Sequence, residues 1–343
     1  MRYDFSRADQ VVRQGIKDQA YTAACLIVGQ KERVLMRRAY GRLSSEDDAP
    51  RANEQTRFDL DSITKPLVIG MLTMRAMEAG KLCLNDRLGT FIHAPEDKAD
   101  ITVAQLLCHS AGLNENLNLL QITSAPQEAA QAILNTPLAA APGKKVHYGC
   151  AGYILLGQLL ECLYGMELSE LAMQEVFWPL GMQRTGYLPK DGNIAATEMQ
   201  ESGRCLQGEV YDQNARFFGG VSGNAGVFST MDDLALWMQM IAAEGTLPNG
   251  SQYLSRHTIR RMMREFASER TPGFALPGTD GFTGDLFPSE TIGHTGFTGC
   301  SVAYDPNEKV YVIFLTNRVC PSSENPAIHR IRRLLHNAVY AAV

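Results

Sequence analysis

The spacing of hydrophobic positions differs between the two ends of the chain and its middle. Near the N-terminus, residues 23–28 form an apolar run rich in β-forming residues, and a Gly-Gln-Lys-Glu turn separates them from residues 33–36. Near the C-terminus, residues 300–304 and 310–315 flank the turn sequence Asp-Pro-Asn-Glu. These segments predict a β-hairpin at each end of the chain.

The middle of the chain has helical periodicity. Thr102 and Gln105 fit a capping box at the start of one helix, and residues 152–164 are apolar nearly all round, which predicts a buried helix. Another helix is expected to begin after Thr230, and a last helical pattern covers residues 326–339. Together these elements predict an α/β (α+β) fold, with an antiparallel sheet flanked by helices and a large, mostly helical insertion.

The order of these elements also suggests a division into domains. We expect residues 1–80 and 220–343 to form a discontinuous α/β sandwich domain, and residues 81–219 to form a helical insertion domain. The chain has 343 residues, of which 45% are hydrophobic, so a large core can be built. An active site is expected in the cleft between the two parts, where pockets commonly form.

Composition and charge exclude several classes of protein. The formal net charge is −5 and no basic block exists, which argues against nucleic-acid binding. No apolar run reaches the length of a membrane span, and the first residues contain no apolar signal-like segment, so we expect a cytoplasmic protein without membrane contact. The eight cysteines show no Cys-x-x-Cys pair and no zinc-ligand spacing. We therefore expect buried thiols, no metal, no cofactor and a small-molecule substrate; the sequence carries no signal for an oligomeric state.

Ser62 and Lys65 form the first candidate for chemistry. They lie three residues apart at the predicted start of an apolar helix, where they would share a face. A partly desolvated lysine can be neutral enough to activate a serine, and the free amides at a helix start favour a developing oxyanion. The Ser-x-x-Lys motif is short, however, and a helix-capping serine beside a solvated lysine explains it as well.

Tyr148 is the second candidate. It lies on a loop just before the buried helix, in the sequence Lys-Lys-Val-His-Tyr-Gly-Cys. A tyrosine can relay protons when nearby cations lower its pKa. The simpler interpretation is a packed ring that covers the start of the helix.

The third candidate is the segment His294, Thr295 and Gly296 at the start of a C-terminal strand. Glycine allows close approach of a ligand to the backbone, and an edge strand offers amides to a substrate. The alternative is a tight strand start with a hydrogen-bonded histidine.

Taken in this order, the three motifs resemble those of the serine β-lactamase and penicillin-binding-protein superfamily. The class C β-lactamase-like branch, which also contains family VIII esterases and D-amino-acid peptidases, is the most similar. The resemblance covers most of the chain, since further stretches match the branch at residues 101–113, 141–157, 178–182 and 226–234.

The resemblance implies a role for each motif. Ser62 would be the acylated nucleophile. Lys65 and Tyr148 would share the deprotonation of this serine and the protonation of the leaving group. The backbone amides of Ser62 and Phe297 would form the oxyanion hole.

Two departures from the branch bear on the substrate. His294 stands where class C enzymes have the lysine of a Lys-Thr-Gly motif, and an unperturbed imidazole is mostly neutral at pH 7. Thr295 and Gly296 keep the rest of that substrate-binding segment. Cys150 stands where the asparagine of a Tyr-x-Asn motif is usual, and a thiol cannot make the hydrogen bonds of an amide. Both changes favour esters, amides or muropeptide-like molecules over efficient penicillin hydrolysis.

A further stretch, residues 208–215, resembles a Gly-Glu-Val-x-Asp-x-Asn-Ala sequence found in part of the branch. In one interpretation its polar residues Asp212 and Asn214 line the cleft and bind substrate. In the other, they brace a loop through hydrogen bonds to the backbone. The sequence favours the two equally.

These motifs predict a serine hydrolase that works through an acyl-enzyme on a small ester, amide or D-amino-acid peptide. A genuine β-lactamase or a D-Ala carboxypeptidase of the penicillin-binding-protein type is the first alternative. The second is a non-catalytic binding module that retains the fold, because the Tyr-Gly-Cys motif departs from the usual pattern.

Overall fold

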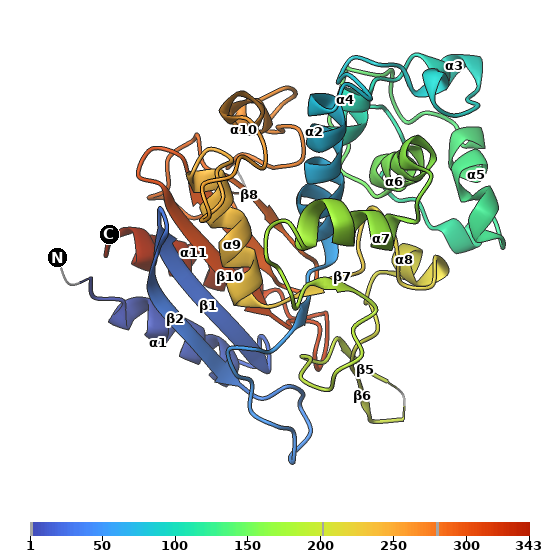
Figure 1. Cartoon of the computed structure of the whole chain (residues 1–343). Helices are drawn as coiled ribbons and strands as arrows, with labels where there is room; N and C mark the ends of the chain where they lie inside the picture. Colours follow the sequence, from blue (N-terminus) through green and yellow to red (C-terminus); the bar gives the residue numbers. More distant parts are fainter. Residues whose placement is uncertain (1–2, 201, 279–280) are drawn as a thin grey trace.

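The main sheet of the protein joins the two ends of the chain. A computed structural model describes residues 3–200, 202–278 and 281–343. The sheet has five antiparallel strands in the order β2-β1-β10-β9-β8 (Figure 1). These strands are β1 (Ala23–Gln30), β2 (Arg33–Gly41), β8 (Ile292–Thr295), β9 (Ser301–Asp305) and β10 (Val310–Thr316). The hairpins predicted at both ends of the chain are therefore confirmed.

Helices cover both faces of this sheet. Strands β1 and β10 are buried along almost their whole length, which explains why their sequences are continuous apolar runs without alternation. On one face, α1 (Ser6–Lys17) and α11 (Ala327–Tyr340) pack in one hydrophobic cluster. On the other face, α9 (Met231–Ala242) packs against the same two strands in the larger core.

The remaining helices and short strands lie between the two halves of the sheet in the sequence. Helices α2 to α8 gather beside the main sheet (Figure 1). The helices are α2 (Met71–Glu78), α3 (Glu96–Ala99), α4 (Val103–Leu107), α5 (Ala129–Asn135), α6 (Ala151–Tyr164), α7 (Leu168–Ala172), α8 (Gln213–Phe217) and α10 (Arg256–Met263). The short strands are β3 (Phe58–Asp59), β4 (Gly186–Tyr187) and β7 (Val227–Ser229) in one sheet, and β5 (Glu198–Met199) and β6 (Cys205–Leu206) in another.

Local signals in the sequence account for several of these boundaries. The capping box at the start of α4 is present, with the Thr102 hydroxyl accepting from the Gln105 amide at 3.2 Å. Helix α6 is largely buried, as its apolar composition predicts. An antiparallel sheet flanked by helices, with a mostly helical stretch between its two halves, confirms the predicted fold class.

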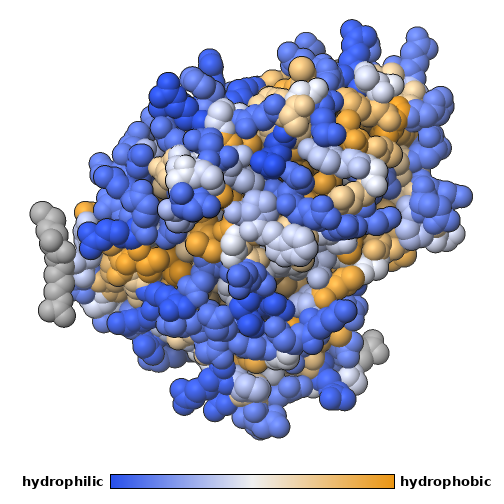
Figure 2. Space-filling model, viewed as in Figure 1, coloured by the Kyte–Doolittle hydropathy of each residue, from blue (hydrophilic) through white to orange (hydrophobic). Residues whose placement is uncertain are grey.

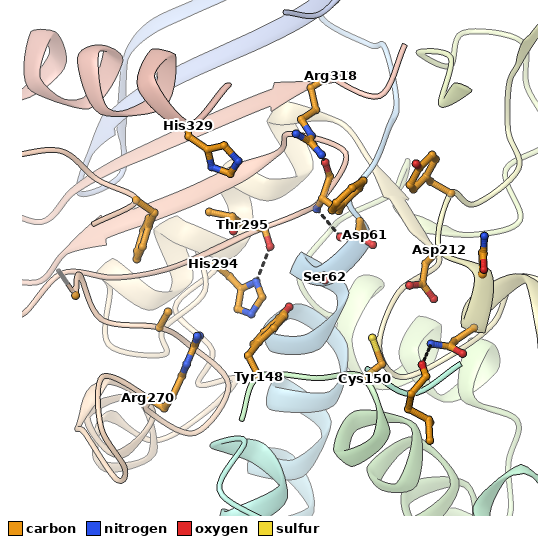
Figure 3. Close-up of a pocket in the computed structure, with 18 of the residues that line it drawn as sticks. Asp61, Ser62, Tyr148, Cys150, Asp212, Arg270, His294, Thr295, Arg318 and His329 are labelled. Atoms are coloured by element: carbon orange, nitrogen blue, oxygen red, sulfur yellow. Dashed lines mark hydrogen bonds between the residues drawn. The ribbon is translucent and has the colours of Figure 1, made fainter. Parts of the chain in front are cut away.

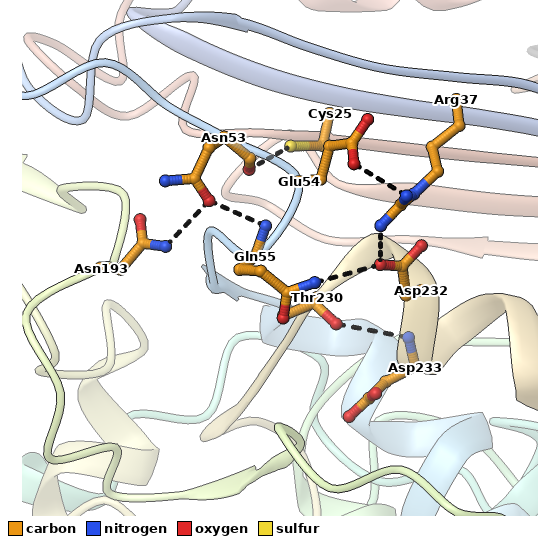
Figure 4. A network of polar contacts seen from close by, with 9 residues as sticks. All are labelled: Cys25, Arg37, Asn53, Glu54, Gln55, Asn193, Thr230, Asp232 and Asp233. Atoms are coloured by element: carbon orange, nitrogen blue, oxygen red, sulfur yellow. Dashed lines mark hydrogen bonds and ion pairs between the residues drawn. The ribbon is translucent and has the colours of Figure 1, made fainter.

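A polar network fastens α9 to the main sheet (Figure 4). Arg37 of β2 pairs with Glu54 at 2.7 Å and with Asp232 in the first turn of α9. The Thr230 hydroxyl caps the same turn by accepting from the Asp233 amide at 3.3 Å. Since these side chains are partly exposed, each ion pair adds little stability, and the network mainly orients the helix.

The cysteines only partly follow the sequence expectation. All eight are free, and none lies in the segments that the structure leaves undescribed. Cys83 and Cys162 are exposed, so the expectation of buried thiols is wrong for these two. The sulfur atoms of Cys205 and Cys320 lie 3.6 Å apart, which sequence spacing does not reveal.

The surface is mainly polar on the face shown in Figure 2, where hydrophobic residues gather in separate patches. Within the described ranges, every helix is too short or too polar to cross a membrane.

Candidate active site

A cavity of about 870 Å³ lies beside the edge strand β8 and receives residues from the sheet, from the turn before α2 and from the loops around α8 (Figure 3). It brings together most of the site residues that the sequence predicts. Its lining includes Ser62, Tyr148, Cys150, Asp212, Asn214, His294, Thr295 and Phe297. Lys65 is fully buried behind Ser62, and Gly296 is buried between β8 and the turn that carries Ser62.

Gly296 lets the edge of the sheet approach the serine turn closely. A Cβ atom at this position would lie 2.5 Å from the Leu60 carbonyl oxygen, which no side chain can tolerate without a shift of the backbone. The glycine therefore lets the chain after β8 pack against the serine turn, a role in packing that the motif, read as a ligand contact, does not predict.

The turn around Ser62 brings the Lys65 side chain within hydrogen-bond distance of the serine. Asp61–Ile63 forms a 3₁₀ turn and Lys65–Gly70 a π-helical turn before α2 begins. The Lys65 Nζ donates to Ser62 Oγ at 2.9 Å and to the Asn224 carbonyl oxygen at 3.0 Å. The predicted pairing of Ser62 with Lys65 is present, although the helix starts less regularly than the sequence indicates.

Lys65 is charged in this environment. Burial lowers its pKa, but nearby negative groups, among them Asp61 and Asp212, raise it, and the net shift is upward. The ammonium therefore donates to Ser62 Oγ.

The Tyr148 ring lies between two cations. Lys65 Nζ is 5.2 Å and the Arg270 guanidinium 5.1 Å from the ring centroid. The ring also packs on His109, with centroids 4.5 Å apart, and the Gly149 amide donates to His109 Nδ1 at 3.3 Å. Burial, with the nearby cations, holds the His109 pKa well below its usual value, so a neutral imidazole supports the tyrosine loop.

His294 is neutral as well. Burial, followed by the positive charges of Lys65 and Arg270, lowers its pKa well below the ordinary value of 6.5. Its Nδ1 lies 2.9 Å from the Thr295 carbonyl oxygen, which can only accept, so Nδ1 carries the proton. His294 Nε2 is then a buried acceptor without a partner among the described residues. The residue cannot replace the lysine charge of the related motif, which agrees with the expectation from the sequence.

Two arginines supply the positive charge that His294 lacks. Arg270, in the loop after α10, and Arg318, just after β10, both line the cavity (Figure 3). The Arg318 Nε donates to the Phe297 carbonyl oxygen at 2.6 Å, and its guanidinium lies 4.3 Å from the Phe297 ring centroid. The motifs miss both arginines. A charged residue at the end of an apolar strand is a weak sequence signal for Arg318. No sequence signal points to Arg270.

Asp212 and Asn214 line the cavity and also brace the backbone. Asp212 Oδ1 accepts from the Ala215 amide at 2.8 Å, capping α8, and from Asn224 Nδ2 at 2.9 Å. The Asn214 side chain accepts from one amide and donates to one carbonyl of residues 117–119. The Asn214 amide thus braces the backbone, as the second interpretation predicts. Asp212 uses Oδ1 in the same way, and its other carboxylate oxygen remains for the cavity.

Cys150 lies at the start of α6 without capping it. Burial raises the pKa of its thiol, and nearby Lys65 and Asn224 only partly oppose this. A neutral thiol beside Lys65 supplies neither a charge nor an amide, in keeping with the sequence expectation.

Carboxyl groups gather next to the serine. Asp59 accepts from the Asp61 amide at 2.9 Å and from the Tyr211 amide at 2.7 Å. Burial, followed by the proximity of Asp61, raises the pKa of Asp59 to about 7. Burial, followed by Asp212, also raises the pKa of Asp61. No motif in the sequence includes Asp59 or Asp61, although an acid directly before Ser62 is visible in the sequence.

One of the two amides predicted for the oxyanion hole already has a hydrogen-bond partner in the chain itself. The Phe297 amide donates to Asp61 Oδ2 at 2.5 Å (Figure 3). This carboxyl belongs to the residue directly before Ser62, whose own amide is the other predicted donor.

The fold and this arrangement define a site for acyl transfer through a serine. A buried lysine donates to the serine, a tyrosine ring lies within 5.2 Å of two cations, and the Phe297 amide reaches the residue directly before the serine. The chain belongs to the beta-lactamase family, whose sequence model matches residues 8–336.

Known relatives agree with this family. A protein named "Putative D-alanyl-D-alanine carboxypeptidase" from Salmonella paratyphi A is 27% identical, over 91% of this chain and 82% of its own length. The octameric penicillin-binding protein homologue from Pyrococcus abyssi has the same fold, with a TM-score of 0.77, 20% identity, and coverage of 96% of this chain and 76% of its own. EstCE1, described as a hydrolase with promiscuous acyltransferase activity, has a TM-score of 0.77 at 23% identity and covers 97% of both chains.

Proposed function

We propose that this protein is a serine hydrolase that transfers an acyl group from a small ester, amide or D-amino-acid peptide to Ser62 and then to water. The hydrogen bond of 2.9 Å between Lys65 Nζ and Ser62 Oγ, at the wall of a large cavity, carries this proposal. The family of the chain and the names of its relatives support it.

The positions of the charges assign the proton transfers. Because Lys65 is charged, we assign the Tyr148 hydroxyl as the relay that takes the Ser62 proton and passes a proton to the leaving group. Lys65 Nζ and the Arg270 guanidinium lie 5.2 Å and 5.1 Å from the Tyr148 ring centroid, so positive charge is close to this relay. Ser62 Oγ attacks the substrate carbonyl carbon, and the carbonyl oxygen becomes the oxyanion. Collapse of this intermediate expels the leaving group, which takes the proton from Tyr148.

Hydrolysis of the acyl-enzyme repeats these steps with water. Tyr148 takes a proton from the water while the water attacks the acyl carbon. Ser62 Oγ is then released from the acyl group and receives this proton from Tyr148.

A substrate panel tests the proposed function. We expect turnover of short-chain p-nitrophenyl esters to exceed turnover of nitrocefin, because His294 is neutral and Cys150 offers no amide to orient a lactam. Peptides ending in D-Ala-D-Ala complete the panel. The reverse ranking would contradict the argument from His294 and Cys150. Absence of turnover and of fluorophosphonate labelling in folded protein would favour a non-catalytic binding module.

One observation favours the carboxypeptidase alternative. Arg270 and Arg318 both line the cavity, and a guanidinium binds a carboxylate well. A substrate with a free carboxylate, such as a peptide ending in D-Ala, would meet the positive charge of these arginines, although the lysine of the related motif is missing.

Arg270→Gln tests this alternative. If Arg270 binds a substrate carboxylate, we expect KM for a carboxylate-bearing peptide to rise about tenfold or more, since a hydrogen bond to a charged group contributes about 1.5–3 kcal/mol. KM for a neutral ester should not change. Steady-state kinetics with both substrates measures the difference, and Arg264→Gln, at an exposed residue outside the cavity, is the control. Equal KM changes for both substrates would exclude this role of Arg270.

A further inference from the structure

The carboxyl group of Asp61 lies where the proposed mechanism requires the substrate oxyanion. Its Oδ2 accepts from the Phe297 amide at 2.5 Å. The family resemblance assigns this amide, together with the Ser62 amide, to the oxyanion hole. A carboxyl oxygen accepts the hydrogen bond that an oxyanion would accept, so Asp61 occupies the Phe297 side of the hole.

The backbone holds Asp61 firmly in this place. Its φ angle is 46°, in the left-handed region that aspartate and asparagine tolerate better than most residues. The Asp59 carboxylate accepts the Asp61 amide at 2.9 Å and fixes this turn. On the opposite side, a Cβ atom built at Gly296 would lie 3.3 Å from the Asp61 Cβ, so the sheet edge approaches closely. The side chain is only 3% exposed.

The Asp61 carboxyl and a substrate oxyanion compete for the same donor. Burial, followed by the nearby carboxyl of Asp212, raises the pKa of Asp61, and Lys65 only partly opposes this. Whether charged or neutral, the carboxyl oxygen takes the hydrogen bond of the Phe297 amide. An oxyanion can therefore develop in the hole only after the Asp61 carboxyl has left it.

We propose that Asp61 is an internal occupant of the oxyanion hole, which the substrate carbonyl must displace from the Phe297 amide before Ser62 can be acylated. This inference rests on the proposed function, because it concerns the same hole. It makes Asp61 a positioning and inhibitory residue that slows acylation without taking part in it.

Two variants separate the carboxyl from the backbone effect. Asp61→Gly removes the side chain and suits a φ of 46°. Asp61→Asn keeps the size and one oxygen acceptor but removes the charge, and asparagine also tolerates this backbone. The rate of Ser62 labelling by a fluorophosphonate and kcat/KM for a neutral p-nitrophenyl ester are measured for both. Thermal melting reports whether each variant is folded.

We expect Asp61→Gly to be acylated about a hundredfold faster than the natural protein, the lower end of the range that one oxyanion-hole donor contributes. Asp61→Asn should be intermediate. An unchanged or slower rate in folded Asp61→Gly would overturn the proposal. A similar loss in both variants would also overturn it, because the carboxylate would then be needed for the chemistry.

A readout without catalysis separates this proposal from the proposed function. In protein with ¹⁵N-labelled phenylalanine, the Phe297 amide resonance should move upfield in Asp61→Gly and return downfield when acetate is added, because acetate fills the vacated hole. This result would support the occupied hole even if no substrate were turned over. An amide resonance that is the same in the natural protein and in Asp61→Gly would refute the occupied hole, whatever the activity.

Discussion

Replacing Ser62 by alanine is expected to abolish covalent labelling by a fluorophosphonate and to lower ester turnover by about a thousandfold or more, as for other nucleophile deletions. The reason is geometric: Ser62 Oγ lies at the cavity wall and accepts a hydrogen bond of 2.9 Å from Lys65. Intact-protein mass spectrometry before and after incubation measures the adduct, and peptide mapping locates it.

Ser222→Ala is the matched control for this experiment. Ser222 is buried and lies in a Gly-Val-Ser-Gly-Asn stretch that misses a nucleophile elbow by one glycine. Its hydroxyl donates to the Asn224 side chain at 2.7 Å and stays away from the cavity lining. The Ser222→Ala protein should still form the adduct. A labelled Ser62→Ala protein would show that another residue is the nucleophile.

Tyr148→Phe is expected to lower kcat by about a hundredfold to ten-thousandfold, the range for loss of a general acid–base group. The phenylalanine ring keeps its packing on His109 and its place between Lys65 and Arg270. KM for a neutral ester and the melting temperature should therefore change little. Steady-state kinetics and thermal unfolding check the two parts of this prediction.

Tyr153→Phe is the control for the loss of a tyrosine hydroxyl. Tyr153 is fully buried, lies 5.9 Å from Lys65 Nζ, and donates to the Leu107 carbonyl oxygen at 2.7 Å. This variant should lose stability of about 1 kcal/mol because the carbonyl is left without a donor, but it should keep its activity. If Tyr148→Phe kept more than a tenth of the natural kcat, Tyr148 would not be the proton relay.

Local chemistry explains which parts of the fold are predictable. The two hairpins follow from apolar runs flanked by turn sequences, and the capping box at Thr102 follows from side chains that reach their own backbone. These interactions join residues that are close in the sequence. The start of α2 is less regular than predicted, since residues 65–70 form a buried π-helical turn.

The sequence by itself determined the fold class and the order of Ser62, Lys65, Tyr148 and His294, since these depend on hydrophobic patterns and short motifs. Only the tertiary structure decided how the site is charged. Negative groups from separate segments raise the pKa of Lys65, and the cavity is lined by Arg216, Arg270 and Arg318, none of which lies in the catalytic motifs.

Asp61 shows the reason most clearly. Its place beside Ser62 is visible in the sequence, but its contact with the Phe297 amide joins residues that are 236 positions apart. Such a contact depends on how β8 packs against the serine turn, and no local pattern records that packing.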